Sequence, residues 1–196
     1  MNNKLELRMY GLVPYNISPI QQAIQFGHAV VEYGQMVKQP QSITKMAIDA
    51  PLLYDDWADN WKTFIILNGG TTNHRTNDDG LPFGSLNQHV LRLDEMKIDF
   101  ATFMEPDLGD QLTAVVFIVD ERVFNRKKYP DFEDWVIENY GELIRSNNYT
   151  TSYMLAQKIK NSESKSDKKV YNEWVKFVGG DKNVFLRDFL KNFKLA

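Results

Sequence analysis

Apolar residues in the first 120 positions alternate with polar ones in some stretches and recur at helical spacing in others. Four stretches show alternation or a short apolar run that ends near a turn signal, and they predict four strands. The run in the second stretch is continuous, which is typical of a strand covered on both faces. The predicted strands span residues 5–13, 61–68, 99–104 and 112–119.

Helical spacing predicts three helices between these strands, at residues 18–38, 52–60 and 83–98, with Ser85 as the cap of the last. Residues 42–48 are a further candidate for a helical turn. Crossover helices favour parallel strand pairs, while the short link between the last two strands favours an antiparallel pair. The expected fold class is α/β, with a small mixed four-stranded sheet and helices on both faces.

The pattern changes after position 119, where further stretches at helical spacing predict an all-helical C-terminal elaboration. They span residues 132–146, 150–160, 167–178 and 182–192, with a polar linker at residues 161–166 and Gly179-Gly180 after the third helix. Residues 193–196 are a candidate edge strand. The sequence thus divides into an α/β core at residues 1–119, a helical insertion at residues 120–180, and a helix and tail at residues 181–196 that return to the core.

The helix predicted at residues 18–38 has a clear start signal. Ser18 can accept a free backbone N–H, Pro19 fits the first helical position, and Gln21 can reach back to the cap. An apolar stripe with several small residues then follows at helical spacing, and we expect this stripe to pack against another element. Its members are Ile20, Ala23, Ile24, Gly27, Val31 and Gly34.

A second stripe on the same helix is wholly polar and consists of Gln21, Gln25, His28 and Glu32. These residues are three or four positions apart, so they lie on one side of the helix. The solvated face of any amphipathic helix shows such a stripe, and so does the wall of a binding site. Both interpretations stay open from the spacing alone.

The segment EPDLGD at residues 105–110 places three carboxylates between the last two predicted strands. Pro106 holds Glu105 extended, and Gly109 permits a turn with positive φ. Asp107 is then expected at the carboxyl end of a strand, where α/β folds expose functional groups. Turn chemistry alone also accounts for Asp and Gly at such a connection.

The composition is that of an ordinary globular protein, with 43% hydrophobic and 25% charged residues and no cysteine. The chain therefore has no disulfide framework, no thiolate nucleophile and no cysteine-ligated zinc. Its first residues do not resemble a signal peptide, and no apolar run approaches the ~20 residues of a membrane span. We expect a cytoplasmic protein that does not contact a membrane.

The histidines and the lysines bear on possible ligands. His28, His74 and His89 have no ligand spacing to one another, so neither a metal nor another cofactor is expected. Residues 158–196 hold ten Lys and Arg against five Asp and Glu, within a chain of net charge −3. Such a basic segment can bind a polyanion, or it can be an ordinary solvated helical surface.

The helix at residue 18 and the acidic segment together resemble the second type of peptidyl-tRNA hydrolase, the family typical of archaea and eukaryotes, with shorter relatives in bacteria and their viruses. That family carries the pattern Gly-Lys-x-Ala-Ala-Gln-x-Ser-His-Ala in its first helix, with which Ala23, Gln25, His28 and Ala29 agree. Its later Asp-x-Gly turn, before the last core strand, is matched by Asp107-Leu108-Gly109.

The resemblance covers residues 5–119 and the tail, including Trp57 and the strand that follows it, and it leaves the helical insertion unexplained. It implies hydrolysis of the ester between a peptide, or an N-blocked amino acid, and the 3′ ribose of tRNA. Two departures stand out: Gln21 replaces the family's lysine, and the threonine after the Asp-x-Gly turn has no clear counterpart, with Gln111 and Thr113 nearby.

For this activity the resemblance assigns catalysis to His28 and Asp107, and substrate binding to Gln21, Gln25, Gln111 and Thr113. Asp107 would activate the attacking water, and the His28 imidazole, which exchanges protons near neutral pH, would shuttle a proton or bind the ribose. The glutamines would position the substrate through hydrogen bonds. The expected partner is tRNA or another RNA end, with homodimerisation left open.

Two other functions stay open. The uncharged Gln21 favours the first, and the acidic body with its appended helices suggests the second. The first is a catalytically degenerate member that binds RNA or a nucleotide, with Tyr171, Trp174 and Phe177 adding stacking or, alternatively, only packing the insertion. The second is an accessory protein that binds a protein partner through the helical insertion.

Overall fold

The computed structural model describes residues 4–39, 47, 49–146 and 152–196. The chain divides into two compact units. Unit 1 comprises Met1–Asp120 together with Leu190–Ala196, and unit 2 comprises Glu121–Phe189. The sequence predicted that the helix and tail from position 181 belong to the core. In the structure this helix belongs to unit 2 as far as Phe189, and only the last residues belong to unit 1.

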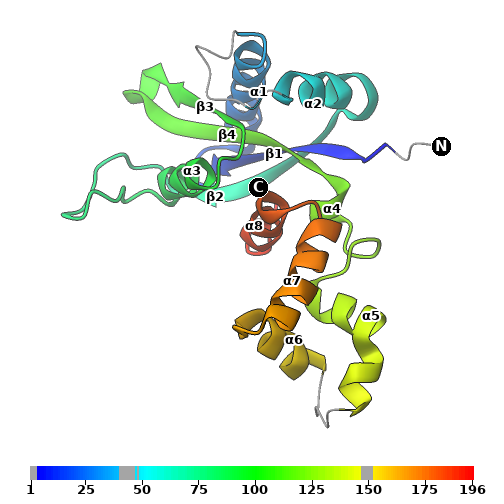
Figure 1. The fold of residues 1–196 in the computed structure, drawn as a ribbon. Helices are drawn as coiled ribbons and strands as arrows, with labels where there is room; N and C mark the ends of the chain where they lie inside the picture. Colours follow the sequence, from blue (N-terminus) through cyan, green and yellow to red (C-terminus); the bar gives the residue numbers. More distant parts are fainter. Residues whose placement is uncertain (1–3, 40–46, 48, 147–151) are drawn as a thin grey trace. The chain divides into compact units, whose positions relative to one another are not determined.

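Unit 1 is built on a four-stranded mixed sheet (Figure 1). The strands lie in the order β2-β1-β4-β3, and β1 pairs with β2 in parallel and with β4 antiparallel. β3 and β4 form an antiparallel hairpin. The expected α/β class is confirmed. The strands are β1 (Leu7–Pro14), β2 (Thr63–Gly70), β3 (Phe100–Glu105) and β4 (Gln111–Asp120).

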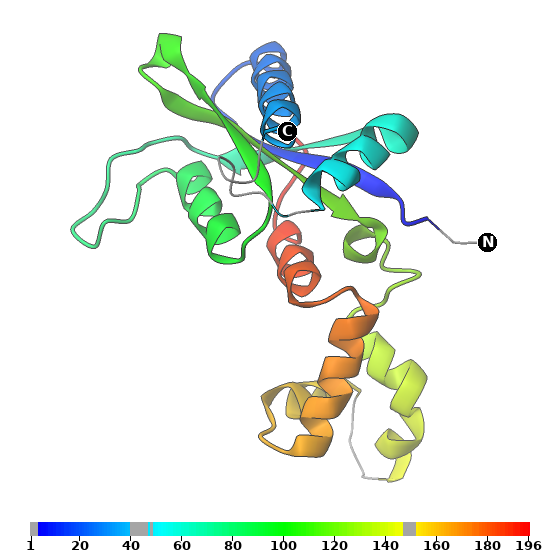
Figure 2. The ribbon, with the colours of Figure 1, turned by 45° about the horizontal axis from the view of Figure 1, so that its top comes forward.

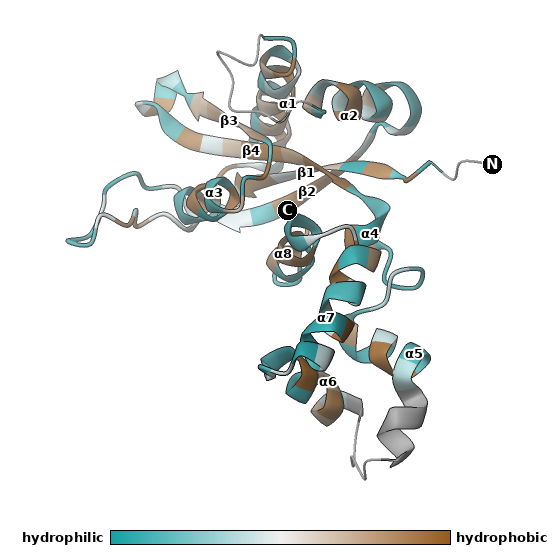
Figure 3. Ribbon diagram, viewed as in Figure 1, coloured by the Kyte–Doolittle hydropathy of each residue, from teal (hydrophilic) through white to brown (hydrophobic). Residues whose placement is uncertain are grey.

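Helices cover the two faces of this sheet (Figure 2). α1 (Pro19–Met36) packs on β3 and β4, and α2 (Ala50–Asp56) continues into the π-helix η1 (Trp57–Trp61) on the same side. α3 (Ser85–Glu95) packs against β2 and β1 from the opposite face. β4 is covered from both sides, so every residue of its interior is buried and its ribbon is mostly apolar (Figure 3).

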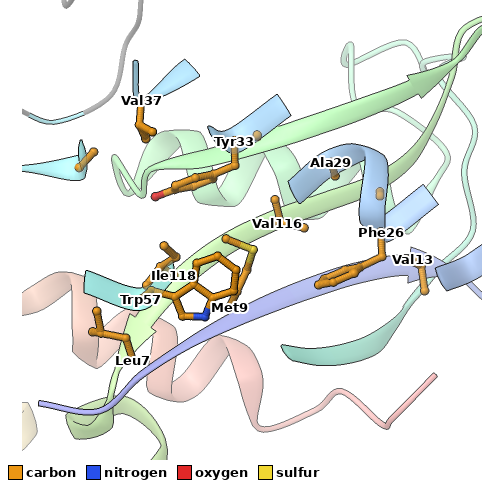
Figure 4. Close-up of a cluster of buried hydrophobic side chains, with 13 residues drawn as sticks. Leu7, Met9, Val13, Phe26, Ala29, Tyr33, Val37, Trp57, Val116 and Ile118 are labelled. Carbon is orange, nitrogen blue, oxygen red and sulfur yellow. The ribbon is translucent and has the colours of Figure 1, made fainter. Parts of the chain in front are cut away.

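The core on the α1 face consists of alternate residues of β1 and β4 under aromatic side chains from the helices (Figure 4). Met9, Val116 and Ile118 point up from the strands, and Phe26 and Tyr33 point down from α1. Phe26 lies directly over β1, where a Cβ on residue 11 would come within 2.2 Å of its ring. Only glycine allows this close approach of helix and strand.

The expectation that the apolar stripe of α1 faces the core is wrong for most of its members. Ile20, Ile24 and Val31 are 75%, 49% and 60% exposed, and of the six stripe residues only Gly34 is buried. The helix instead buries Gln25, Phe26, Ala29, Tyr33 and Gly34. On this face Phe26 packs against Phe64 and Tyr33 packs against Tyr54, and the buried amide of Gln25 finds hydrogen-bond partners, as described below.

Several other predicted details also change. β2 is an edge strand, with Phe64 47% exposed, so the expected cover on both faces is wrong. Trp61 ends the π-helix instead of starting the strand. Ser85 is the first residue of α3 rather than its cap; its hydroxyl accepts the Thr71 N–H.

The expected edge strand of the tail is present as a short pairing with β2. Leu195 bridges antiparallel to Leu67, the Asn68 N–H donates to the Lys194 carbonyl at 2.9 Å, and the Ala196 N–H donates to Ile66 at 3.1 Å. The tail thereby covers part of the free edge of β2. The helical turn considered at residues 42–48 lies outside the described residues, apart from Ala47.

Unit 2 is all-helical, as expected. Its core is formed mainly by aromatic and aliphatic residues of α5, α6 and α7, including Trp135, Leu155 and Trp174. The Trp174 indole is buried and donates to the Pro130 carbonyl at 3.2 Å, so this ring packs the unit rather than stacking on a ligand. The helices are α4 (Glu121–Phe124), α5 (Phe132–Ser146), α6 (Ser152–Asn161), α7 (Lys165–Phe177) and α8 (Asp181–Leu190).

A buried arginine ties the N-terminal part of unit 2 to α8. Arg187 is 1% exposed and donates to the carbonyls of Arg122 and Tyr129 and to the Asp131 carboxylate, the last at 2.8 Å. Its guanidinium also lies 5.8 Å from the centre of the Trp174 ring. A buried charge requires such a set of partners.

Candidate functional site

Three polar side chains from separate elements meet between α1 and the β3–β4 hairpin. The Gln25 amide donates to the Glu105 carboxylate at 2.5 Å, and the Thr113 hydroxyl donates to the Gln25 amide oxygen at 2.8 Å. We call Gln25, Glu105 and Thr113 the polar junction. It joins α1, the end of β3 and the start of β4 within unit 1.

A β-bulge places Thr113 in the junction. Phe103 pairs with Ala114 and Met104 pairs with Leu112, so Thr113 is an extra residue between the two pairs. A bulge changes the direction of the side chain that it carries, and here it allows Thr113 to reach α1. Thr113 has no exposed surface, and its hydroxyl also lies 3.3 Å from the Phe103 carbonyl.

The contacts fix which way the Gln25 amide points. A carboxylate only accepts hydrogen bonds, so the NH₂ group must face Glu105 and the amide oxygen must face Thr113. Gln25 is 8% exposed. In this structure Gln25, oriented by Thr113, therefore holds Glu105 in place.

His28 follows Gln25 by one turn on α1 and lies over Phe103, which precedes Glu105 by two positions on β3. Its ring contacts Phe103 with the ring centroids 4.4 Å apart and the planes at 60°. The His28 side chain is exposed. Thus the polar stripe of α1 is not uniformly solvated: Gln25 faces Glu105, and His28 lies at the solvent boundary above Phe103.

Asp107 lies in a short 3-10 turn, η2 (Pro106–Leu108), at the end of the hairpin. The Glu105 carboxylate accepts the Asp107 N–H at 3.4 Å, and Gly109 and Asp110 follow with φ of 67° and 57°. Asp107 is exposed. Glu105 thereby connects Gln25 to the turn that carries Asp107, although no hydrogen bond joins Asp107 to His28 within the described residues.

The other predicted residues have different surroundings. Gln21 forms both halves of a capping box with Ser18, donating its N–H to the hydroxyl and accepting the Ser18 N–H on its side chain. Gln111 contacts His74 at 2.7 Å, which comes from the loop between β2 and α3. The structure thus unites Gln25 with Thr113 and leaves Gln21 and Gln111 outside the polar junction.

Sequence reasoning did not assign a role to Glu105 or His74. Glu105 had a usable signal: it alternates with Phe103 along β3 and is held extended by Pro106, so it shares the face that α1 covers. The partner of His74 could not be found from sequence, since 37 residues separate it from Gln111.

Two further features concern metal ions and membrane-spanning helices. The described residues contain no group of three His, Cys, Asp or Glu side chains placed to hold a metal ion. None of the described helices is both long and apolar enough to span a membrane.

Comparisons with known proteins do not identify a family for this chain. No family model matches the sequence, and no curated protein matches it significantly. The site contains an exposed carboxylate, Asp107, in a held turn and an exposed imidazole, His28, over Phe103. The buried Gln25 amide links α1 to that turn through Glu105.

Proposed function

We propose that this protein hydrolyses the ester that joins a peptide, or an N-blocked amino acid, to the 3′ end of tRNA. The observation that supports this most directly is the 2.5 Å hydrogen bond between Gln25 and Glu105, which ties the polar stripe of α1 to the acidic segment. These are the two segments on which the resemblance to peptidyl-tRNA hydrolases depends. Such an enzyme acts in the cytoplasm, where translation takes place.

In the proposed reaction, the Asp107 carboxylate takes a proton from a water molecule as the water attacks the ester carbonyl. The bond between the carbonyl carbon and the ribose 3′ oxygen then breaks. Protonated His28 donates a proton to that oxygen, which leaves as the 3′ hydroxyl. The peptide leaves as a carboxylic acid that gives its proton to solvent, and the proton held by Asp107 returns to His28 through solvent. General acid–base assistance of this kind contributes about 10²–10⁴-fold to a rate.

The polar junction has a positioning role in this proposal. Glu105 accepts the Asp107 N–H and is itself held by Gln25, so the turn carrying the base keeps a fixed orientation. Thr113 orients the Gln25 amide. Gln111 and Gln21 remain candidates for substrate contacts through polar atoms that their intramolecular hydrogen bonds leave available.

The test is single-turnover hydrolysis of an N-acetylated aminoacyl-tRNA by Asp107→Asn and His28→Asn. Each variant should lose about 10²-fold or more of the wild-type rate, as expected for loss of a general acid or base. Asp110→Asn and Glu32→Gln are matched controls, because they change exposed residues in the same turn and on the same helix. If both site variants hydrolyse the ester at the wild-type rate, the assignment is wrong.

A second candidate function is RNA binding without turnover, and the state of Gln21 favours it. The family's lysine would supply a positive charge at this position, whereas the Gln21 amide is neutral and engaged in the helix cap. If the wild-type protein binds tRNA in a salt-dependent manner and leaves the ester intact, this alternative replaces the hydrolase.

A further inference from the structure

One side of α7 in unit 2 carries a row of lysines along its whole length. Lys168, Lys169 and Lys176 lie three, four and eleven positions after Lys165, which places all four on one side of the helix with Asn172 among them. All four are exposed, and α7 is largely hydrophilic (Figure 3). We call these four residues the lysine row.

The lysine row lines a surface hollow of about 670 Å³, together with Asn172, Val175 and the start of α8. A second hollow of about 460 Å³ lies at the connection from α6 to α7. The two share Lys168 and Asn172, and the second adds Lys160. The row therefore borders two open surface hollows that share lining residues.

Two of the acidic residues that line these hollows have contacts of their own. Glu173 accepts the Tyr140 hydroxyl at 2.5 Å, and this carboxylate raises the pKa of Tyr140. Glu163 pairs with Lys168 at 2.7 Å, but their side chains are 95% and 54% exposed, so the pair contributes little and can be exchanged for another anion. Asp181 is the remaining acid at the margin.

The size of the row matches a polymer of phosphates better than a single anion. Lys165 and Lys176 are eleven positions apart on the helix, which corresponds to about 16 Å at the usual helical rise. Phosphates of one strand in a duplex repeat about every 3.4 Å along its axis, so the row can reach several of them. Lysines act as flexible point charges, which suits backbone contacts rather than base recognition.

We propose that the lysine row binds the phosphodiester backbone of a nucleic acid. The choice of tRNA as that nucleic acid rests on the proposed function, whereas the binding chemistry does not. Lysine–phosphate contacts release counterions, so binding should weaken steeply with salt and depend little on base sequence. The row then contributes affinity for the body of the RNA and takes no part in the chemical step.

The experiment is fluorescence anisotropy with deacylated tRNA at salt concentrations from 50 to 200 mM. The variant changes the lysine row to glutamine: Lys165→Gln, Lys168→Gln, Lys169→Gln and Lys176→Gln. The matched control removes the same charge from exposed lysines elsewhere: Lys38→Gln, Lys62→Gln, Lys97→Gln and Lys127→Gln. The row variant should lose at least tenfold in affinity for tRNA. Its binding should also depend less on salt, so the slope of log K against log salt should become less steep by about 2–4.

Several results of this experiment and of its extensions to other ligands would overturn the proposal in whole or in part. Equal losses in the row variant and the control would overturn the proposal, as would binding to anionic phospholipid vesicles but not to tRNA. A clear preference for duplex DNA over tRNA would overturn the choice of RNA. Wild-type binding that depends on the row, without ester hydrolysis, would leave the lysine row standing while the hydrolase proposal fails.

Discussion

Gln25 and Glu105 are 80 residues apart in the chain, and their side chains are joined by a hydrogen bond of 2.5 Å. The contact connects the middle of α1 to the last residue of β3 and, through the Asp107 N–H, to the turn that follows. Because the Gln25 amide is buried and oriented by Thr113, each member of the polar junction depends on the other two. This dependence can be measured.

Loss of either neutral member of the polar junction should destabilise unit 1. Gln25→Leu leaves the Thr113 hydroxyl and the Glu105 carboxylate short of a partner, and Thr113→Val removes the donor to Gln25; each should cost about 1–3 kcal/mol in urea unfolding. The double variant should cost about 0.5–1 kcal/mol less than the sum. Gln35→Leu, an exposed change on the same helix, should stay within about 0.5 kcal/mol of wild type. Strict additivity would show that the residues are not coupled.

Two glycines offer opposite effects of the same substitution. Gly11→Ala places a methyl group 2.2 Å from the Phe26 ring and should destabilise the protein by about 1–3 kcal/mol through overpacking. Gly27→Ala meets nothing within 4 Å on an exposed part of α1 and should stabilise it by up to about 1 kcal/mol. Thermal and urea unfolding measure both. A neutral Gly11→Ala would mean that α1 does not approach β1 as closely as described.

Arg187→Met should destabilise unit 2. The change removes the donors to the carbonyls of Arg122 and Tyr129 and to Asp131. Since Asp131 keeps its ion pair with Arg126 at 2.5 Å, we expect a loss of about 2–4 kcal/mol, below the upper end for a broken buried pair. Hydrogen exchange of unit 2 amides measures the loss, with exposed Lys182→Met on the same helix as control. A loss under about 1 kcal/mol would contradict the structural role.

His89 should make stability fall as the pH falls. Its ring packs on Phe193, and burial, aided by the Arg92 charge, lowers its pKa from the usual 6.5 to about 4. The unfolded chain takes up the proton first, so the neutral ring's contribution is complete above pH 6.5 and is lost between pH 6.5 and about 4. The loss should be on the order of 1 kcal/mol, because solvent reaches part of the ring.

The measurement is the free energy of unfolding of wild type and His89→Gln across that pH range. The difference between the two proteins should change in the stated direction, since glutamine does not titrate there. Arg92→Gln should reduce the effect by removing the charge that opposes protonation. A difference that stays constant with pH would refute the assignment.

Local patterns were enough to predict the four strands, the longer helices and the capping box at Ser18, because each depends on neighbours within a few positions. The one-turn helix α4 was not predicted. The hairpin and the parallel β1–β2 pair follow from the lengths of the connections. The position of each strand in the sheet could not be predicted from local patterns. The apolar run in β2 predicted a strand covered on both faces, but β2 lies at the edge of the sheet and Phe64 is half exposed.

The candidate site was predicted only in part for the same reason. The sequence pointed to the polar stripe of α1 and to the acidic segment, and the structure joins them through Gln25 and Glu105. Glu105 was seen as one of three turn carboxylates, and Thr113 as a substitute for a missing family residue. Their contact with Gln25 depends on the bulge in β4, for which the sequence carries no clear signal.

The sequence alone determined the elements of this protein, their order and the two polar segments, since these reflect short-range periodicity and capping. Only the tertiary structure decided which face of α1 is buried. Sequence spacing favoured the aliphatic stripe containing Ile20 and Ile24, yet the helix turns Phe26 and Tyr33 to the sheet and takes Gln25 with them. A helix buries the face whose total packing and hydrogen bonding with its neighbours is best, and those neighbours are distant in the chain.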